Sequence, residues 1–296
     1  MMRPIFRRAS RCAWIVCAGL TSAAASAQSV PTIDTEDAML GSADVGDGWI
    51  HPMFSVDARN GDFARGNYDD DRADLARLPV HAQVGAAIDL SRGADGKTTS
   101  WLVLRSSNGF HAPNRSETRT PRAWYESNNL AAVVFAPLKG LRTAAVYTIK
   151  TSPNHVSGTT HEASVSLAYA GKDGFGSISP TFVVTTRTKG DGGVYAQAAI
   201  EPGVDLGKSE RAPRFSVPLA VGTGWRGFYG AQSGDRLFGS AGAALEAPFL
   251  LGTTHGTMRW EALALVRDDR LAALSGPDGE TGTVIPLVTW SLSVAY

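Results

Sequence analysis

Cysteine is almost absent from this sequence. Of 296 residues only Cys12 and Cys17 are cysteines, and both lie within the first twenty positions. A chain without that segment has neither thiol chemistry nor a disulfide, so its stability has to come from a large sheet or core. A long apolar run is missing too, because no stretch of 18 apolar residues follows residue 27. That absence excludes a membrane-spanning helix there.

The N-terminal segment has the three parts of an export signal. MMRPIFRRASR holds four arginines and no acid, the short apolar run CAWIVCAGLTSAAA follows, and Ala25-Ser26-Ala27 offers a cleavage site. This order predicts a secretory signal peptide over residues 1–27, followed by a leader over residues 28–46 that lacks periodicity. The whole chain has 28 basic and 28 acidic residues, and loss of the four arginines leaves 24 against 28. A net charge of −4 argues against nucleic acid as a partner.

From about residue 47 the sequence is a series of strand-like segments separated by Gly, Asn, Asp and Pro. Most segments approach the 9–11 residues that a tilted strand needs to cross a bilayer. The segments, twelve in all, are about 47–57, 80–91, 98–106, 127–137, 141–151, 160–170, 176–187, 192–201, 213–223, 236–247, 256–267 and 283–296. No stretch in this region predicts a helix.

Several of these segments alternate strictly between apolar and polar residues, as HAQVGAAIDL, HEASVSLAYA and TMRWEALALV do. The final stretch VTWSLSVAY places Val288, Trp290, Leu292, Val294 and Tyr296 on one face and small residues on the other. A period of two predicts β-strands with one face in an apolar medium and the other in a polar one. TSWLVLRS and NLAAVVFA do not decide which face is the apolar one.

The connections differ in length on the two sides. With the N-terminus on the periplasmic side, the odd-numbered connections face outward, and three of them, at 58–79, 107–126 and 268–282, are the longest. Long polar outer loops and short inner turns are typical of outer-membrane barrels. The short 188–191 and the long 202–212 are exceptions.

These features together resemble a Gram-negative outer-membrane β-barrel protein of the porin type. The ending Trp290-x-Leu292-x-Val294-x-Tyr296 is similar to the C-terminal signature that such barrels present to the barrel-assembly machinery. The resemblance implies an all-β fold, a transmembrane up-and-down antiparallel barrel of about twelve strands over residues 47–296. It also implies a location in the cell outer membrane, with membrane lipid and the assembly machinery as partners.

Charged and polar residues on the less apolar strand faces are expected to line the barrel lumen, because a charge pointing into hydrocarbon is costly. These lumen candidates are His81, Gln83, Asp89, Arg142, Lys150, Glu162, Gln197, Glu246, Arg259, Glu261 and Arg267. They could brace a narrow barrel or select solutes. The sequence therefore predicts a channel for passive diffusion of small hydrophilic solutes, without a cofactor. A surface or adhesion barrel that does not conduct is an alternative.

Catalytic and metal-binding patterns are weak. His155-x-Ser157 matches part of the His-x-Ser-Asn pattern of lipid-hydrolysing barrels, but Gly158 stands where asparagine belongs and an orienting residue is missing. A lipid hydrolase using His155 and Ser157 is thus an alternative, while the prediction is that the chain is not an enzyme. Asp69-Asp70-Asp71 with Asp74 lacks the ligand order of a calcium loop, and the six histidines show no HExxH spacing. No metal site is predicted.

Overall fold

The structure, a computed structural model, is a closed antiparallel β-barrel. The predicted signal peptide, the leader, the acidic run 69–71 with Asp74, and Tyr296 lie outside the residues that it describes. Those residues are 49–61, 63–68, 78–113, 118–155, 157–169, 177–209, 211–230, 233–252, 254–275 and 282–295.

Each barrel strand pairs antiparallel with its neighbour in the chain, and the first strand pairs with the last. Closure is made by a seven-residue ladder that runs from Met53 opposite Ala295 to Arg59 opposite Thr289. The long strands are β1 (Ile50–Arg59), β4 (Val80–Arg92), β5 (Thr98–Phe110), β6 (Trp124–Leu138), β7 (Leu141–Thr151), β8 (Thr160–Tyr169), β9 (Thr181–Lys189), β10 (Val194–Ile200), β13 (Leu219–Trp225), β14 (Arg236–Leu251), β15 (Thr254–Arg267) and β16 (Val284–Ala295).

Two short strands extend the wall where proline interrupts a longer one. β11 (Gly203–Asp205) continues β10 beyond Pro202, and β12 (Arg214–Ser216) precedes β13 across Pro218. Proline lacks the N–H that a ladder needs, so each long strand is divided at that residue. Counting each divided strand once gives twelve, which confirms the all-β fold class and the number predicted from the alternating pattern.

The two faces of the wall differ as the period of two requires. Large apolar side chains point outward, and Val165, for example, is 58% exposed on the barrel surface. The same is true of Val84, Leu90, Leu104, Val133, Phe135, Leu167, Phe182, Val221, Leu237, Trp260, Val266 and Val288. The structure also decides the two segments TSWLVLRS and NLAAVVFA, whose lipid-facing side the sequence left open. In them Trp101, Val103, Ala132 and Val134 are buried inside the barrel.

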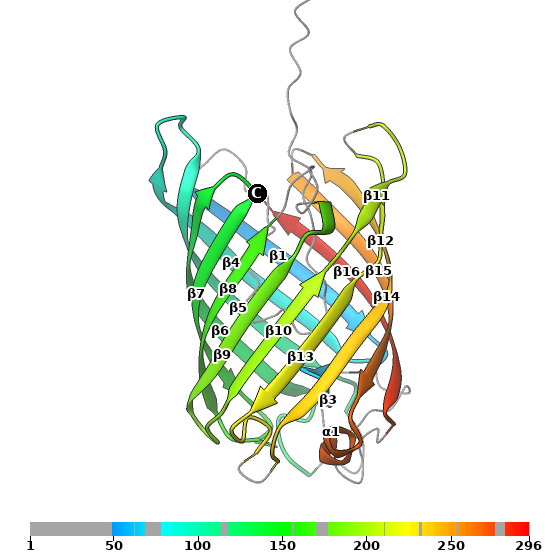
Figure 1. Cartoon of the computed structure of the whole chain (residues 1–296). Helices are drawn as coiled ribbons and strands as arrows, with labels where there is room; N and C mark the ends of the chain where they lie inside the picture. The colour runs from blue at the N-terminus through cyan, green and yellow to red at the C-terminus, as the bar shows by residue number, and fades with distance from the viewer. Residues whose placement is uncertain are drawn as a thin grey trace, which may run out of the picture.

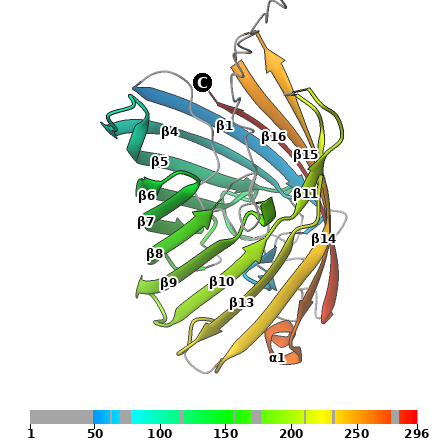
Figure 2. The same cartoon turned by 45° about the horizontal axis from the view of Figure 1, so that its top comes forward.

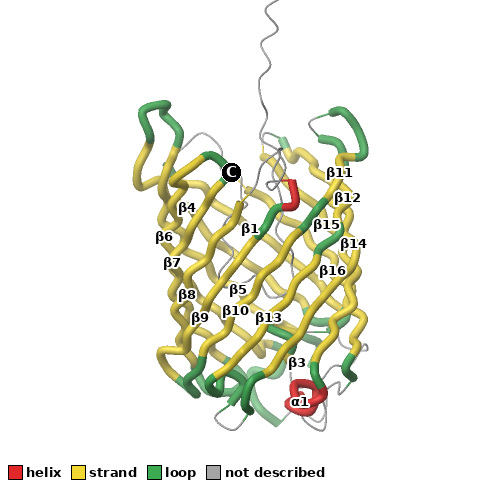
Figure 3. The backbone as a smooth tube through the Cα atoms, in the orientation of Figure 1, coloured by secondary structure: helices red, strands yellow, loops and turns green. Residues whose placement is uncertain are grey.

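The barrel has two unlike ends. One end, here called the turn end, holds the start of β1, the end of β16 and the connections at 93–97 and 139–140 (Figures 1 and 2). The opposite end, the loop end, holds the connections that follow β1, β5, β7, β9, β13 and β15. Loops and turns gather at these two ends, and strands form the wall between them (Figure 3).

The connection after β1 carries a small hairpin of its own. β2 (Phe63–Ala64) pairs with β3 (Asn67–Tyr68) in a separate two-stranded sheet, here called the inner hairpin. It lies within the barrel near the loop end, and α1 (Asp269–Ala272) with the 3₁₀ turn η2 (Ala273–Ser275) lies beside it. Among the described residues, no helix is long and apolar enough to cross a membrane.

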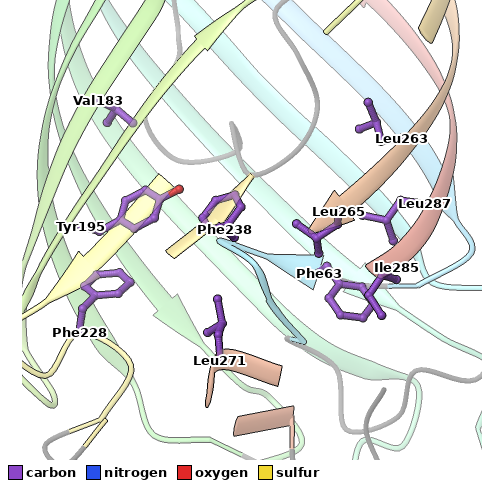
Figure 4. Packing of buried hydrophobic residues seen from close by; sticks show 10 residues of the cluster. All are labelled: Phe63, Val183, Tyr195, Phe228, Phe238, Leu263, Leu265, Leu271, Ile285 and Leu287. Carbon is purple, nitrogen blue, oxygen red and sulfur yellow. The ribbon is translucent and has the colours of Figure 1, made fainter. Parts of the chain in front are cut away.

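An apolar cluster fills part of the lumen at the loop end, and Figure 4 shows it from close by. Phe63 of the inner hairpin and Leu271 of α1 meet side chains from five wall elements. The cluster, here called the lumen core, consists of Phe63, Val183, Tyr195, Phe228, Phe238, Leu263, Leu265, Leu271, Ile285 and Leu287. The barrel is therefore partly closed at this end by a packed core.

Candidate functional site

A cavity of about 450 Å³ lies at the loop end, beside the lumen core. Its walls come from the inner hairpin, the first residues of β6, the β7–β8 connection and the residues around Arg187 and Tyr229. The lining is mainly polar, with Arg65, Asn67, Tyr125, Glu126, Asn128, Lys150, Ser152, Asn154, Ser157, Thr160, Arg187, Asp191 and Tyr229 among its members. This loop-end cavity is the candidate functional site.

A β-bulge places two consecutive side chains on the inside of the barrel. Phe110 lies opposite Trp124 and Gly109 opposite Glu126, so Tyr125 is the extra residue between the two pairs. Trp124 stays outside, stacked on Phe110 with ring centroids 6.3 Å apart, whereas Tyr125 is buried over Gly109. An extra residue re-aims the side chains that follow it, so Tyr125 and Glu126 both face the cavity.

Tyr125 is fixed by a buried chain of polar groups. Its hydroxyl lies 3.0 Å from Nε2 of His81, and Nδ1 of His81 lies 3.2 Å from the Asp57 carboxylate. A carboxylate only accepts, so Nδ1–H donates to Asp57 and Nε2 accepts from the Tyr125 hydroxyl. Arg59 donates to the same Asp57 oxygen at 2.7 Å. Strands β1, β4 and β6 are thereby tied together beneath the cavity.

Arg65, at the tip of the inner hairpin, fastens the hairpin to the wall. Its two Nη atoms each donate at 2.8 Å to one oxygen of Glu162, the two-pronged geometry that suits guanidinium and carboxylate. The guanidinium lies 5.0 Å from the ring centre of Tyr195 and 5.2 Å from that of Phe228. Tyr229 donates its hydroxyl to the carbonyl of Arg65 at 2.7 Å. These contacts hold a loop segment inside the barrel, against the wall.

No side chain fits at Gly66, the next residue of the hairpin tip. Its φ is +76°, and a Cβ there would lie 2.6 Å from the Phe238 ring. Arg267 donates to the Gly66 carbonyl at 3.2 Å. The backbone can therefore rest directly on the lumen core.

Two further clusters of charge lie toward the turn end. Arg259 donates to Glu201 at 2.7 Å and to Glu261 at 2.5 Å, and Glu246 lies 3.8 Å away. Asp89 accepts from Thr98 at 2.5 Å and from Arg92 at 2.7 Å, with Nε2 of His51 3.3 Å away. In both clusters opposite charges are paired along the wall within a few ångströms of each other.

The lumen candidates from the sequence are distributed over the whole length of the barrel. Those that are buried inside it are His81, Asp89, Glu162, Gln197, Glu246, Arg259, Glu261 and Arg267, while Gln83, Arg142 and Lys150 are half-buried. Only Lys150 borders the loop-end cavity directly, and His81 and Glu162 lie behind it through Tyr125 and Arg65. Whether these side chains select solutes stays a prediction.

Sequence reasoning missed Arg65, Tyr125, Glu126 and Arg187, which shape the cavity. Arg65 lies in a loop without periodicity, and Tyr125 faces inward only because of the bulge. For Arg65 the signal that could have found it is the tripeptide Ala-Arg-Gly at 64–66, a turn in an otherwise polar loop. Its glycine permits the positive φ seen there.

The proposed pair His155 and Ser157 lies in the β7–β8 connection and not on a strand. His155 is exposed and has a φ of +60°, while Ser157 borders the cavity. Within the described part of the chain, neither side chain makes a hydrogen bond, and no group of three or more His, Cys, Asp or Glu residues could hold a metal ion. The pair thus lacks the orienting contact of a catalytic triad.

Comparison with solved structures finds two of low similarity to this chain. LpxR from Salmonella typhimurium is 9% identical, with a TM-score of 0.43 over 82% of this chain and 99% of its own. A bacterial polysaccharide outer membrane secretin is 8% identical, with a TM-score of 0.43 over 84% of this chain and 98% of its own. No family model and no curated protein matches.

This comparison corrects one prediction from the sequence. The chain was expected not to be an enzyme, yet LpxR, an outer-membrane lipid A deacylase, is among the barrels that it is similar to. The prediction that the chain is not an enzyme is therefore contradicted. At 9% identity the deacylase activity itself remains a property of LpxR.

Proposed function

We propose that this chain is an outer-membrane channel of narrow bore, through which small hydrophilic solutes diffuse passively by way of the loop-end cavity. The observation that carries the proposal is the polar cavity of about 450 Å³ beside a lumen core that fills part of the loop end. Membrane lipid, the assembly machinery and the solute are the partners that this function implies.

The membrane location is supported by the two faces of the wall. Exposed side chains on the outside are valine, leucine, phenylalanine and tryptophan along nearly every strand, while Glu162, Gln197 and Arg259 are buried inside. A closed barrel leaves no unpaired sheet edge, which is the condition for a sheet to exist in lipid. An outer apolar band around a polar interior is the arrangement of outer-membrane barrels.

A passage along one side of the barrel is supported by the distribution of bulk. The large aromatic residues of the lumen core come from β10, β14, the 226–230 turn and the inner hairpin. On the wall of β6 to β8 the inward side chains include the small Ala132, Ala144, Ser164 and Ser166, together with the larger Leu130, Val134 and Val146 of a second buried apolar cluster. A twelve-stranded barrel lies between the eight strands that just fill their interior and the sixteen that leave an open channel. With the lumen core on one side of its loop end, a barrel of this size would leave a narrow path along the opposite side of the lumen.

The ion pairs also favour weak selectivity between cations, anions and neutral solutes. Arg65 and Arg187 share Glu162, and Arg259 lies between Glu201 and Glu261. Because opposite charges lie within a few ångströms of each other in both clusters, their fields are partly offset over the width of a solute. Small neutral or zwitterionic solutes should pass at least as well as simple ions.

Planar-bilayer recording of the purified full chain tests the proposal. We expect small discrete conductance steps, and Arg65→Ala should raise their size or their open-state noise because it releases the inner hairpin from Glu162. Arg122→Ala is the matched control, since Arg122 is an exposed arginine at the same end and should change nothing. Silent bilayers with a folded, heat-modifiable barrel would overturn the channel.

A further inference from the structure

We infer that the loop-end cavity binds a neutral polyhydroxylated ligand, a mono- or disaccharide, through Asn128 and the aromatic rings of Tyr125 and Tyr229. The inference rests on the proposed function, because the saccharide is the solute that the channel would admit. It goes further in giving the solute a chemical class and a built binding site.

Three of the charged side chains around the cavity, Arg65, Arg187 and Glu126, already have partners. Arg65 and Arg187 both donate to Glu162, the second at 3.3 Å. Glu126 accepts from the Asn128 amide. An ionic ligand would have to displace one of these pairs and leave a buried charge uncompensated, which is costly. The cavity is therefore poorly suited to a charged ligand.

The amide oxygens beside these pairs are different. Oδ1 of Asn128 and Oδ1 of Asn67 are buried, and neither accepts a hydrogen bond within the part of the chain that the structure describes. Asn128 is only 3% exposed and borders the cavity. Buried polar atoms are nearly always satisfied, so an unpaired oxygen on a residue that borders a cavity indicates a donor that comes from elsewhere. A hydroxyl group of a ligand is such a donor.

Aromatic rings supply the other half of a saccharide site. Tyr125 and Tyr229 both border the cavity, and each presents an apolar ring with a polar tip. The hydroxyl of Tyr125 is held by His81 and that of Tyr229 by the Arg65 carbonyl. Both rings are thus fixed in orientation before a ligand arrives, which reduces the entropy lost on binding. Apolar C–H faces of a sugar ring can pack on them while its hydroxyls reach the amides.

The cavity has a suitable size. About 450 Å³ lies within the range of roughly 300–1,000 Å³ that small-molecule sites occupy. Serine and threonine side chains at Ser152, Ser157 and Thr160 add hydroxyl groups that can both donate and accept. The site has the composition to bind one or two sugar units by many neutral hydrogen bonds.

Saturation-transfer NMR with the full chain in nanodiscs measures this binding directly, with sucrose as the probe and glucose 6-phosphate as its charged counterpart. We expect saturable sucrose binding to the wild type. Asn128→Leu should raise the half-saturating concentration about tenfold, the effect of one lost hydrogen bond to a buried group. Asn129→Leu is the matched control, because the neighbouring Asn129 is exposed on the outer face of the same strand.

If Asn128→Leu does not fold, Tyr229→Leu in the 226–230 turn gives a second variant with the same expected loss. Equal sucrose binding by Asn128→Leu and Asn129→Leu would overturn the inference, as would saturable binding of glucose 6-phosphate without sucrose. Conductance without any saturable sucrose binding would overturn the site and leave the channel. Sucrose binding in silent bilayers would leave the site and overturn the channel.

Discussion

At the scale of single residues, Glu162 is the buried counter-charge that joins the inner hairpin to the wall. It is fully buried on β8 and accepts from Arg65 of the inner hairpin and Arg187 of β9. We expect Glu162→Gln to destabilise the folded barrel by about 3–5 kcal/mol, because two guanidinium groups lose their buried counter-charge. Denaturant unfolding of the barrel in detergent measures it. The double variant Arg65→Leu with Glu162→Gln should cost less than the sum of the two single variants, and strictly additive losses would contradict the pairing.

Gly222 is a second residue that matters for stability, because its lack of a side chain leaves room for the Phe238 ring of the lumen core. A Cβ on Gly222 would lie 2.4 Å from the Phe238 ring and 3.0 Å from the Tyr195 hydroxyl. Gly222→Ala should therefore cost about 1–3 kcal/mol of unfolding free energy through overpacking of the lumen core. Gly158→Ala is the control, because nothing lies within 4 Å of a Cβ there. Equal stability of the two variants would mean that the ring can move aside.

At the scale of elements, α1 packs Leu271 into the lumen core although it is only one turn long. Asp268 caps it by accepting from the Leu271 amide at 2.7 Å, and also accepts from the Leu237 amide of β14 at 2.8 Å. Asp268→Ala should cost about 1–2 kcal/mol through the lost cap and speed amide exchange across 269–275. The exposed Asp269→Ala should cost less than about 1 kcal/mol, since it loses only a dipole interaction. Similar exchange in both variants would show that the cap is not what holds α1.

Elements also show how far the sequence could predict this fold. The twelve wall strands were predictable because the barrel buries one face of each, so the period of two survives from β4 to β16. The inner hairpin was not, since Phe63–Ala64 and Asn67–Tyr68 are too short to show a period. The loop-end cavity depends on a bulge at Tyr125 and on contacts across 97 residues between Arg65 and Glu162. Such long-range pairings leave no local pattern in the sequence.

At the scale of the whole molecule, the open question is which solvent surrounds the barrel. Val165 of β8 and its partner Val184 of β9 lie midway along their strands and face outward. In a bilayer, Val165→Arg should cost about 2–4 kcal/mol at mid-depth, whereas Leu138→Arg, at the turn end of β6, should cost about 0–1 kcal/mol near the interface. In water both substitutions would place a charge on an exposed surface and cost within about 0.5 kcal/mol. Unfolding free energies measured after refolding into lipid vesicles separate the two cases. A depth-dependent cost supports a barrel that spans the membrane, and equal small costs would place it in water.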